Sequence, residues 1–379
     1  MFIVARRVFA IDHEHVESRA SDIRLPTEHP ALALTLYSSI MIKTQLTESL
    51  GLRVPLVMGG MQWVGTPKLA VSVTNAGALG IITALTQPTP EDLKKVLIEA
   101  QKHVYDDIAA ERKNKYGSIG VNITLLPAIV PPDYAGYARA ALDAGIRIFE
   151  TAGNNPGPVI EILKGAGAFV IHKCTTVRHG LKAIQCGADM LSIDGFECAG
   201  HPGEEDIGGL LLLALAAENI KVPFIASGGI ANGRGLAAAL ALGAQGANMG
   251  TRFMATAESE IHERIKNVIV EKSERDTIHI LRTFKNTARV FRAPLTEKVV
   301  EMEKNGASIQ DILPLVTGKR GRKVYENGDP EIGVWTAGVS LGLIHDIPTV
   351  RELVTRVERE AEECLAAASA MVVSPKPRL

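Results

Sequence analysis

The chain has 379 residues, of which 46% are hydrophobic, and its formal net charge at pH 7 is −1. This length fits one large α/β domain with additions, or two domains, and the near-neutral charge gives no basic surface for nucleic acid. Aromatic residues make up only 4% of the chain, which argues against surfaces that stack nucleic-acid bases.

Residues 1–45 carry mixed charge, two prolines and no sustained hydrophobic period, so we expect an N-terminal extension outside the main fold. Acidic residues near its start argue against a mitochondrial transit peptide, and the last three residues only loosely resemble a peroxisomal signal. No apolar run approaches the ~20 residues that span a bilayer. We therefore expect a cytoplasmic protein with no membrane span and no nucleic-acid partner, and a homodimer is left open.

From about Lys43 to Phe253, short apolar runs alternate with alanine-rich helical stretches, as in parallel strands joined by crossover helices. We expect strands at Pro55–Met58, Leu79–Thr83, Ile119–Thr124, Arg147–Glu150, Phe169–His172, Met190–Asp194, Pro223–Ala226 and Gly246–Met249. We expect helices at Thr66–Ala76, Pro90–His103, Tyr134–Ala144, Pro156–Gly165, Val177–Cys186 and Gly233–Leu242. Eight strands in this alternation predict a (β/α)8 TIM barrel. A doubly wound open sheet is the alternative, but no GxGxxG follows the first strand.

Beyond the eighth expected strand the pattern changes. Residues 257–330 hold many charges and amphipathic pieces but few strands, so we expect an added helical segment packed over one rim of the barrel. A final helix at about Pro348–Met371 is expected to return to the barrel wall. The predicted division is an extension at 1–45, the barrel at 46–256, the helical addition at 257–346, and the C-terminal helix with its tail at 347–379.

Polar residues follow several of the expected strands, where barrel enzymes place their active sites. Gly60, Met61 and Gln62 follow the first strand, Thr124 ends the third, and Lys173 follows the fifth. Gln62 and Thr124 are plausible partners for the edge of a heterocycle, or for a backbone group. Lys173 is suited to neutralise an anionic ligand; alternatively, it is a lysine whose charged end reaches water.

The sixth expected strand ends in a glycine-rich loop, Asp194–Gly203, that carries His201. Ala199 and Gly200 precede the histidine and have almost no side chain, so a flat group could lie against their backbone. The alternative interpretation is a surface turn with a solvated histidine.

Two glycine turns after the seventh and eighth expected strands predict a phosphate site. Ser227, Gly228 and Gly229 form the first turn, and Gly250 and Thr251 form the second. Backbone N–H groups in such turns bind anions, and the helix that begins near residues 232–235 would add a partial positive charge. Barrels commonly bind phosphate at these two strands.

We expect no metal site, because the histidines and cysteines of the chain do not have the spacing of a known metal motif. The cysteines are scattered without a CxxC pair, which indicates free thiols in a reducing compartment. The residues considered are His172, His179, His201, Cys174, Cys186, Cys198 and Cys364.

Taken together, these segments resemble the nitronate monooxygenases, formerly called 2-nitropropane dioxygenases, over about residues 44–292. The resemblance is carried by Gly59–Gly65, Asn122–Pro127, Glu150–Pro156, His172–His179, Asp194–Asp206, Ala226–Gly235 and Met249–Phe253. Several of these pieces look especially like the bacterial branch described as NADH:quinone reductases. The N-terminal 45 residues and the insert Asp106–Lys115 depart from the bacterial pattern.

The resemblance implies that the barrel binds FMN, with His201 as the active-site histidine. The flavin would be lined by Gly60, Met61 and Gln62, reached by Thr124 and Lys173, and flanked by Ala199 and Gly200. Its phosphate would be held by Ser227, Gly228, Gly229, Gly250 and Thr251.

Two reactions are compatible with that resemblance. One is oxidation of an alkyl nitronate by O2 to a carbonyl compound and nitrite, and the other is reduction of a quinone by NADH. Two further readings stay open: a barrel that has lost catalysis, and an FMN barrel similar to IMP dehydrogenase that uses Cys198 as a nucleophile, although we expect Cys198 to be packed.

Overall fold

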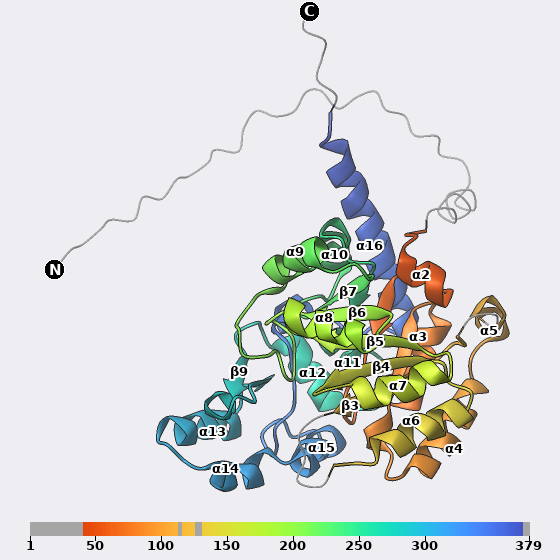
Figure 1. Ribbon diagram of the computed structural model, residues 1–379. Coiled ribbons are helices and arrows are strands. Elements are labelled where there is room, and N and C mark those ends of the chain that lie inside the picture. The colour runs from red at the N-terminus through yellow and green to blue at the C-terminus, as the bar shows by residue number, and fades with distance from the viewer. Residues whose placement is uncertain (1–40, 113–115, 126–130, 374–379) are drawn as a thin grey trace, which may run out of the picture. The chain divides into compact units, whose positions relative to one another are not determined.

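Eight parallel strands close into a barrel in the computed structural model, which describes residues 41–112, 116–125 and 131–373 (Figure 1). Each strand pairs with the next along the chain, and β8 pairs with β1. The strands are β1 Leu56–Met58, β2 Leu79–Thr83, β3 Gly120–Leu125, β4 Ile148–Gly153, β5 Phe169–Cys174, β6 Met190–Asp194, β7 Phe224–Ser227 and β8 Ala247–Asn248. All eight expected strands are present, and the predicted TIM barrel is confirmed; the open sheet is excluded.

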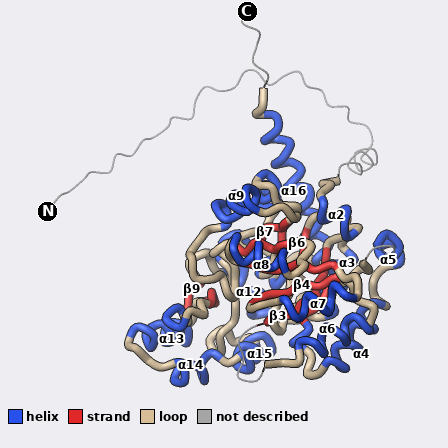
Figure 2. The backbone as a smooth tube through the Cα atoms, in the orientation of Figure 1, coloured by secondary structure: helices blue, strands red, loops and turns tan. Residues whose placement is uncertain are grey.

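Helices connect the strands and form the outer layer of the barrel (Figure 2). Five of them have an N-cap residue whose side chain accepts a hydrogen bond from a backbone N–H of the first turn. The described helices of this layer are α3 Pro67–Asn75, α4 Pro90–Gln101, α5 Asp106–Arg112, α6 Tyr134–Asp143, α7 Gly157–Gly165, α8 Val177–Gln185, α9 Gly209–Asn219 and α10 Gly233–Ala241, with the 3-10 turn η1 at Ala84–Thr86.

Helix α9 was missing from the sequence prediction. Its leucines follow one another without a break, which gives no helical period. Four helices of this layer are followed by a glycine with positive φ, from 90° to 104°, as a left-handed C-terminal cap requires; these are Gly77, Gly145, Gly187 and Gly243.

The barrel interior is filled with aliphatic side chains and closed at its amino end by α2 (Gln45–Leu50). Leu46 and Leu50 of α2 are fully buried and pack with Val57, Leu79 and further strand residues that point inward. Helix α2 is also tied to the barrel wall by a hydrogen bond from the Thr44 hydroxyl to the Gln245 carbonyl, at 2.7 Å. The amino end is therefore a packed core, which leaves the opposite end for a binding site.

The segment after β8 forms the addition that covers the carboxyl rim of the barrel. It is mostly helical, as the sequence predicted, and it also contains a two-stranded antiparallel sheet whose strands the sequence prediction did not locate. Its elements are α11 Thr251–Met254, α12 Glu263–Glu271, β9 Thr277–Ile280, η2 Arg282–Phe284, β10 Ala288–Phe291, α13 Pro294–Lys304, α14 Ile309–Val316, α15 Gly318–Asn327 and η3 Val339–Leu343. The strands were missed because each has four residues and carries charged or polar side chains.

The last helix, α16 (Val350–Ala370), packs against α10 and α3 on the outside of the barrel (Figure 1). The Glu360 carboxylate accepts a hydrogen bond from the Gly233 backbone N–H at the start of α10, at 2.9 Å. The described part of the chain contains no helix that is long and apolar enough to span a membrane. Residues 1–40 and 374–379, which carry most of the expected extension and the tail, lie outside the described residues, and the proposed domain boundaries stay a prediction.

Candidate active site

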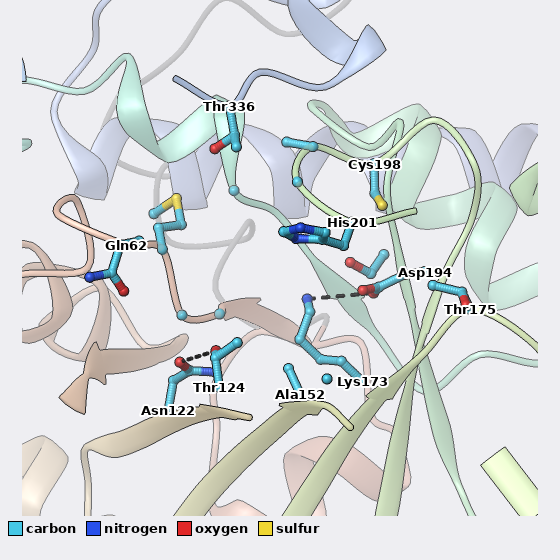
Figure 3. Close-up of a pocket in the computed structure, with 18 of the residues that line it drawn as sticks. Gln62, Asn122, Thr124, Ala152, Lys173, Thr175, Asp194, Cys198, His201 and Thr336 are labelled. Carbon is cyan, nitrogen blue, oxygen red and sulfur yellow. Dashed lines mark hydrogen bonds and ion pairs between the residues drawn. The ribbon is translucent and has the colours of Figure 1, made fainter. Parts of the chain in front are cut away.

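A cavity of about 1390 Å³ opens at the carboxyl ends of the barrel strands. Its walls come from the strand ends and from the addition after β8, including Lys285, Gly318 and Thr336. All the residues that we expect to bind the flavin or to act in catalysis line this one cavity, and Figure 3 labels Gln62, Thr124, Lys173 and His201 among them. They are Gly60, Met61, Gln62, Thr124, Lys173, Ala199, Gly200, His201, Ser227, Gly228, Gly229, Gly250 and Thr251.

A buried carboxyl group organises the floor of the cavity. The Oε1 atom of Glu150, on β4, accepts hydrogen bonds from the Gly60 backbone N–H and from the Asn122 amide, both at 2.8 Å. Glu150 is fully buried, and burial raises the pKa of its carboxyl group. A Cβ atom on Gly60 would lie 2.1 Å from Asn122 Cγ, so only glycine fits beside this group. In the sequence, Glu150 ends an expected strand and begins one of the segments that carry the family resemblance, but no pattern assigned it this role.

Lys173, on β5, is the fixed positive charge of the site. Its Nζ atom lies 3.4 Å from Asp194 Oδ1 at the end of β6 (Figure 3). Burial alone would lower the pKa of Lys173, but the negative charges of Asp194 and Glu150 outweigh that effect and raise the pKa above its ordinary value. Lys173 therefore stays protonated at neutral pH.

Three hydroxyl groups expected to face a ligand already have protein partners. The Thr124 hydroxyl donates to Asn122 Oδ1 at 2.8 Å, the Thr251 hydroxyl accepts from the Gly338 N–H at 3.0 Å, and the Ser227 hydroxyl accepts from the Asn248 amide at 3.3 Å. Thr124 can therefore only accept a further hydrogen bond, which limits the ligand atoms it could contact.

The two glycine turns expected to hold phosphate lie side by side, because β7 and β8 are neighbours in the barrel. Gly228 and Gly229 have φ values of 88° and 74°, which side-chain-bearing residues rarely adopt. The second turn leads directly into the short helix α11, which begins at Thr251. The two turns together present backbone N–H groups and a helix start on one side of the cavity.

One part of the expected phosphate site was wrong. The start of α10 does not line the cavity, and two of its N–H groups already have partners: Gly233 donates to Glu360 of α16, and Gly235 donates to Asn232. Helix α11 occupies the position at the cavity that the sequence prediction had given to α10.

The loop that carries His201 is held by the β9–β10 hairpin. Gly200 and Arg289 exchange backbone hydrogen bonds of 3.1 and 2.6 Å, which adds a strand-like contact next to His201. The Arg289 guanidinium also donates to the Phe196 carbonyl at 2.9 Å and to the Thr277 hydroxyl at 3.0 Å. The side chain of Glu204, further along the loop, accepts hydrogen bonds from Thr287. Nothing in the sequence pattern indicated this clamp.

His201 faces open cavity space, and Figure 3 shows its ring above the end of the Lys173 side chain. Its surface is accessible from the cavity, while the protein around the ring restricts hydration of the charged form. Burial therefore lowers the pKa of His201 below its ordinary value of 6.5, despite the opposing effect of Glu204. The imidazole is neutral at pH 7 and is able to accept a proton.

Other titratable groups of the cavity are structural. His172 Nδ1 lies 2.9 Å from the Thr151 hydroxyl, and burial lowers its pKa to about 4. Burial also raises the pKa of the Cys198 thiol, which is 7% exposed, so its nucleophilic thiolate form is disfavoured. Among the described residues, no group of three or more histidine, cysteine or acidic side chains is arranged to hold a metal ion.

A closed parallel barrel with a large polar-lined cavity at its carboxyl rim is the architecture of a barrel enzyme. The sequence model of the nitronate monooxygenase family matches residues 43–360. The chain belongs to this family, and it is an oxidoreductase.

Curated relatives extend over most of the chain. A protein of Mycobacterium tuberculosis named (3aS,4S,5R,7aS)-5-hydroxy-7a-methyl-1-oxo-octahydro-1H-indene-4-carboxyl-CoA dehydrogenase is 29% identical over 368 residues, which covers 87% of this chain and 99% of that protein. A probable nitronate monooxygenase of Staphylococcus haemolyticus is 29% identical over 263 residues, covering 62% of this chain and 74% of that protein.

Solved structures of the same fold are also similar. FabK from Thermotoga maritima superposes with a TM-score of 0.79 at 33% identity, covering 87% of this chain and 100% of that one. A nitroalkane oxidase from Streptomyces ansochromogenes has a TM-score of 0.70 at 23% identity, covering 85% of this chain and 99% of that one, which supports the fold alone.

Proposed function

We propose that this protein binds FMN in the rim cavity and oxidises alkyl nitronates with O2 to a carbonyl compound and nitrite. The observation that carries the proposal is that His201 and Lys173 line one cavity of a nitronate monooxygenase family member, the first with a lowered pKa and the second with a raised pKa. A proton acceptor and a fixed cation suit a substrate that is either a carbon acid or its anion.

The cavity walls suit a flavin nucleotide. A Cβ atom built on Gly200 would meet no atom within 4 Å, so free space lies against this backbone, as a flat ring requires. The turns at Gly228–Gly229 and Gly250–Thr251 supply N–H groups for a phosphate on the adjacent wall. FMN, when bound, supplies a ring that accepts electrons from the substrate and that O2 can reoxidise.

The protein residues would stabilise negative charge and accept a proton from the substrate. Lys173 would stabilise negative charge near the floor of the cavity, because Asp194 and Glu150 keep it protonated. The neutral imidazole of His201 would take a proton from a neutral nitroalkane, or polarise a nitronate that arrives as the anion. Gly60 and Met61 would position the ring through a loop fixed by Glu150 and Thr83.

Anaerobic stopped-flow spectroscopy tests the proposal. The purified holoprotein is mixed with propyl-2-nitronate or with NADH, and bleaching of the flavin absorbance is followed for both reductants side by side. We expect rapid bleaching by the nitronate and, once air is admitted, release of nitrite. Rapid bleaching by NADH without any reduction by the nitronate would refute nitronate oxidation. A colourless protein that stays colourless after FMN is supplied would refute the flavin site itself.

The second candidate is an NADH:quinone reductase on the same fold, and the size of the cavity favours it. At about 1390 Å³, the cavity exceeds the ~300–1,000 Å³ of ordinary small-molecule sites, so space would remain beside a flavin for a nicotinamide or a quinone. Turnover of NADH with a quinone as acceptor, at a rate above that with nitronates and O2, would select this function.

A further inference from the structure

A second cavity, of about 410 Å³, lies beside the active-site cavity. Its volume falls within the ~300–1,000 Å³ of ordinary small-molecule sites. Two side chains, Trp63 and Tyr325, line both cavities. These two shared aromatic residues therefore stand between the active site and a second space that is large enough to hold part of a ligand.

The two shared side chains are not held equally firmly. Tyr325 is 7% exposed and forms a hydrogen bond with Thr336. Trp63 is only half-buried, and its ring lies beneath the Arg322 guanidinium, with the Cζ atom 5.0 Å from the ring centroid. Arg322 in turn forms a surface ion pair with Glu326, at 2.6 Å. Exposed ion pairs and exposed cation–π contacts are weak, so Trp63 is the wall that can move.

Trp63 also has two unfavourable local features. Its φ of 65° lies in the left-handed region, where a bulky side chain is an outlier. Its indole Nε1–H is buried and has no acceptor among the described residues, although buried donors are nearly always paired. A Cβ atom on Gly318, which lines the active-site cavity, would lie 4.0 Å from Nε1. Strain of this kind gathers at ligand clamps and switch regions, which favours a ligand-dependent role for this side chain.

The lining of the second cavity suits an uncharged, largely apolar group. Pro67 and Ile261 add apolar surface to the two shared aromatic side chains. The Thr86 hydroxyl is already used, because it donates to the Thr83 carbonyl at 2.6 Å. An anionic group would be repelled by the carboxylate of Glu260, which also lines this cavity.

We propose that the second cavity is a subsite for the distal alkyl chain of the substrate, and that Trp63 is the specificity-determining residue that opens it. The indole moves from beneath Arg322 when the alkyl chain extends beyond the active-site cavity, and the chain then contacts Pro67 and Ile261. Short substrates leave Trp63 in place. The proposal deepens the function above, on which it rests, by assigning long-chain alkyl nitronates to the substrates.

Tryptophan fluorescence tests the movement directly, because the chain has only two tryptophans. In the holoprotein carrying Trp335→Phe, Trp63 is the one tryptophan that remains. We expect 1-nitrooctane, under anaerobic conditions, to shift the emission maximum of Trp63 saturably and to increase its quenching by acrylamide. Nitroethane, which has the same head group, should change neither. No response to 1-nitrooctane, or an equal response to both compounds, would overturn the proposal.

Arg322→Gln tests the subsite through the reaction, because it removes the contact that holds Trp63 and leaves the active-site cavity intact. Anaerobic bleaching of the flavin is followed with octyl-1-nitronate and with propyl-1-nitronate. We expect the concentration of the octyl compound that gives half the maximal rate to fall about threefold, as the loss of an exposed cation–π contact predicts. The value for the propyl compound should not change. Trp63→Ala, which removes the wall itself, should act in the same direction by a larger factor.

The matched control is Lys323→Gln, which changes the net charge equally at an exposed neighbour on α15 that lines neither cavity. It should behave as the unmodified protein does. An unchanged preference for chain length in Arg322→Gln, or the same change in the control, would overturn the proposal. Absence of bleaching by either nitronate would refute the proposed reaction instead, and the response of Trp63 to 1-nitrooctane would still decide whether the subsite exists.

Discussion

His201 and Lys173 line the same cavity, but their surroundings shift their pKa values in opposite directions. Restricted hydration lowers the pKa of the His201 imidazole, whereas two nearby carboxyl groups raise the pKa of the Lys173 ammonium group. The site therefore holds a proton acceptor and a permanent cation at neutral pH. This division of roles is what deprotonation of a carbon acid requires, because the developing anion needs a positive partner.

Replacing His201 with glutamine tests its proposed role as the base. The variant should keep its bound flavin and lose about 10²-fold in kcat/KM for a neutral nitroalkane, with a smaller loss for the nitronate anion. In the unmodified protein, the neutral imidazole is the active form, so kcat/KM should rise with pH to a plateau, with a midpoint below 6.5. His103→Gln, an exposed histidine next to Glu99, is the control. Unchanged nitroalkane turnover in His201→Gln would remove the residue from the chemistry.

The conformation of Gly228 explains why a larger residue should not be tolerated there. Its Cβ would lie 2.9 Å from Cys198 Cβ and 3.0 Å from the Gly195 carbonyl, so Gly228→Val would push against the His201 loop rather than simply block a phosphate. We expect loss of flavin and a lower melting temperature. Gly167→Val is the control, because it has a similar φ of 71° but open space around it, and so should pay only the backbone cost of ~1–2 kcal/mol. Equal flavin content in the two variants would contradict this account.

At the scale of elements, the β9–β10 hairpin extends the active-site loop rather than the barrel wall. It contributes a backbone bridge to Gly200 and the Arg289 guanidinium, which fills the space beside Phe196. Arg289 is 8% exposed; its guanidinium joins the hairpin to the loop through the Phe196 carbonyl and also donates to Thr277 of β9 within the hairpin. The position of His201 therefore depends on an element that lies outside the barrel.

Arg289→Met should loosen this loop without unfolding the barrel. We expect a stability loss of about 1–3 kcal/mol, because buried acceptors lose a charged donor, and faster amide hydrogen exchange in the segment 195–206. Nitronate turnover should fall together with a shift of its pH midpoint toward 6.5, as His201 becomes more hydrated. Arg275→Met is the control, because the Arg275 side chain is 90% exposed. Unaltered exchange in the loop would show that the clamp is not needed.

At the scale of the whole described unit, an ion cluster joins the barrel, the addition and the last helix. Arg252 of α11 is 2% exposed and donates to Asp346 at 2.9 Å, and Arg356 of α16 donates to the same carboxylate at 2.6 Å. The hydrogen bond from Arg356 lowers the pKa of Asp346 most, with Arg252 adding to the effect. This carboxylate is what keeps the buried Arg252 charge compensated.

Asp346→Asn should therefore destabilise the protein by ~2 kcal/mol, less than for a fully enclosed pair because the Asp346 side chain is 45% exposed. Since the folded-state pKa of Asp346 is lowered, its contribution is present above pH ~4 and is lost as the pH falls through that lowered value. Chemical unfolding at pH 7 and at pH 3 should show a difference between the variant and the unmodified protein that shrinks in acid. Asp143→Asn, which breaks a pair exposed on both sides, should cost little at either pH.

The positions of most strands and helices of the barrel could be predicted from local patterns in the sequence. The eight strands were recognisable because buried parallel strands read as short apolar runs, and the glycines after the helices marked their ends. Elements without a clear period were missed. Helix α9 lacks a polar face in its first turns, and β9 and β10 are short strands with charged side chains.

The sequence by itself determined the barrel, the family and the set of residues that meet at the rim, because parallel strands in βα alternation bring their carboxyl ends to one side. Tertiary structure alone decided how those residues are used. Glu150 under Gly60, Asp194 beside Lys173 and Arg289 beside Gly200 lie 90, 21 and 89 positions apart in the chain. Charges and hydrogen bonds act between residues that are close in space. The pKa shifts, the protein partners of the hydroxyl groups and the position of α11 rather than α10 at the cavity therefore depend on contacts that no local sequence pattern records.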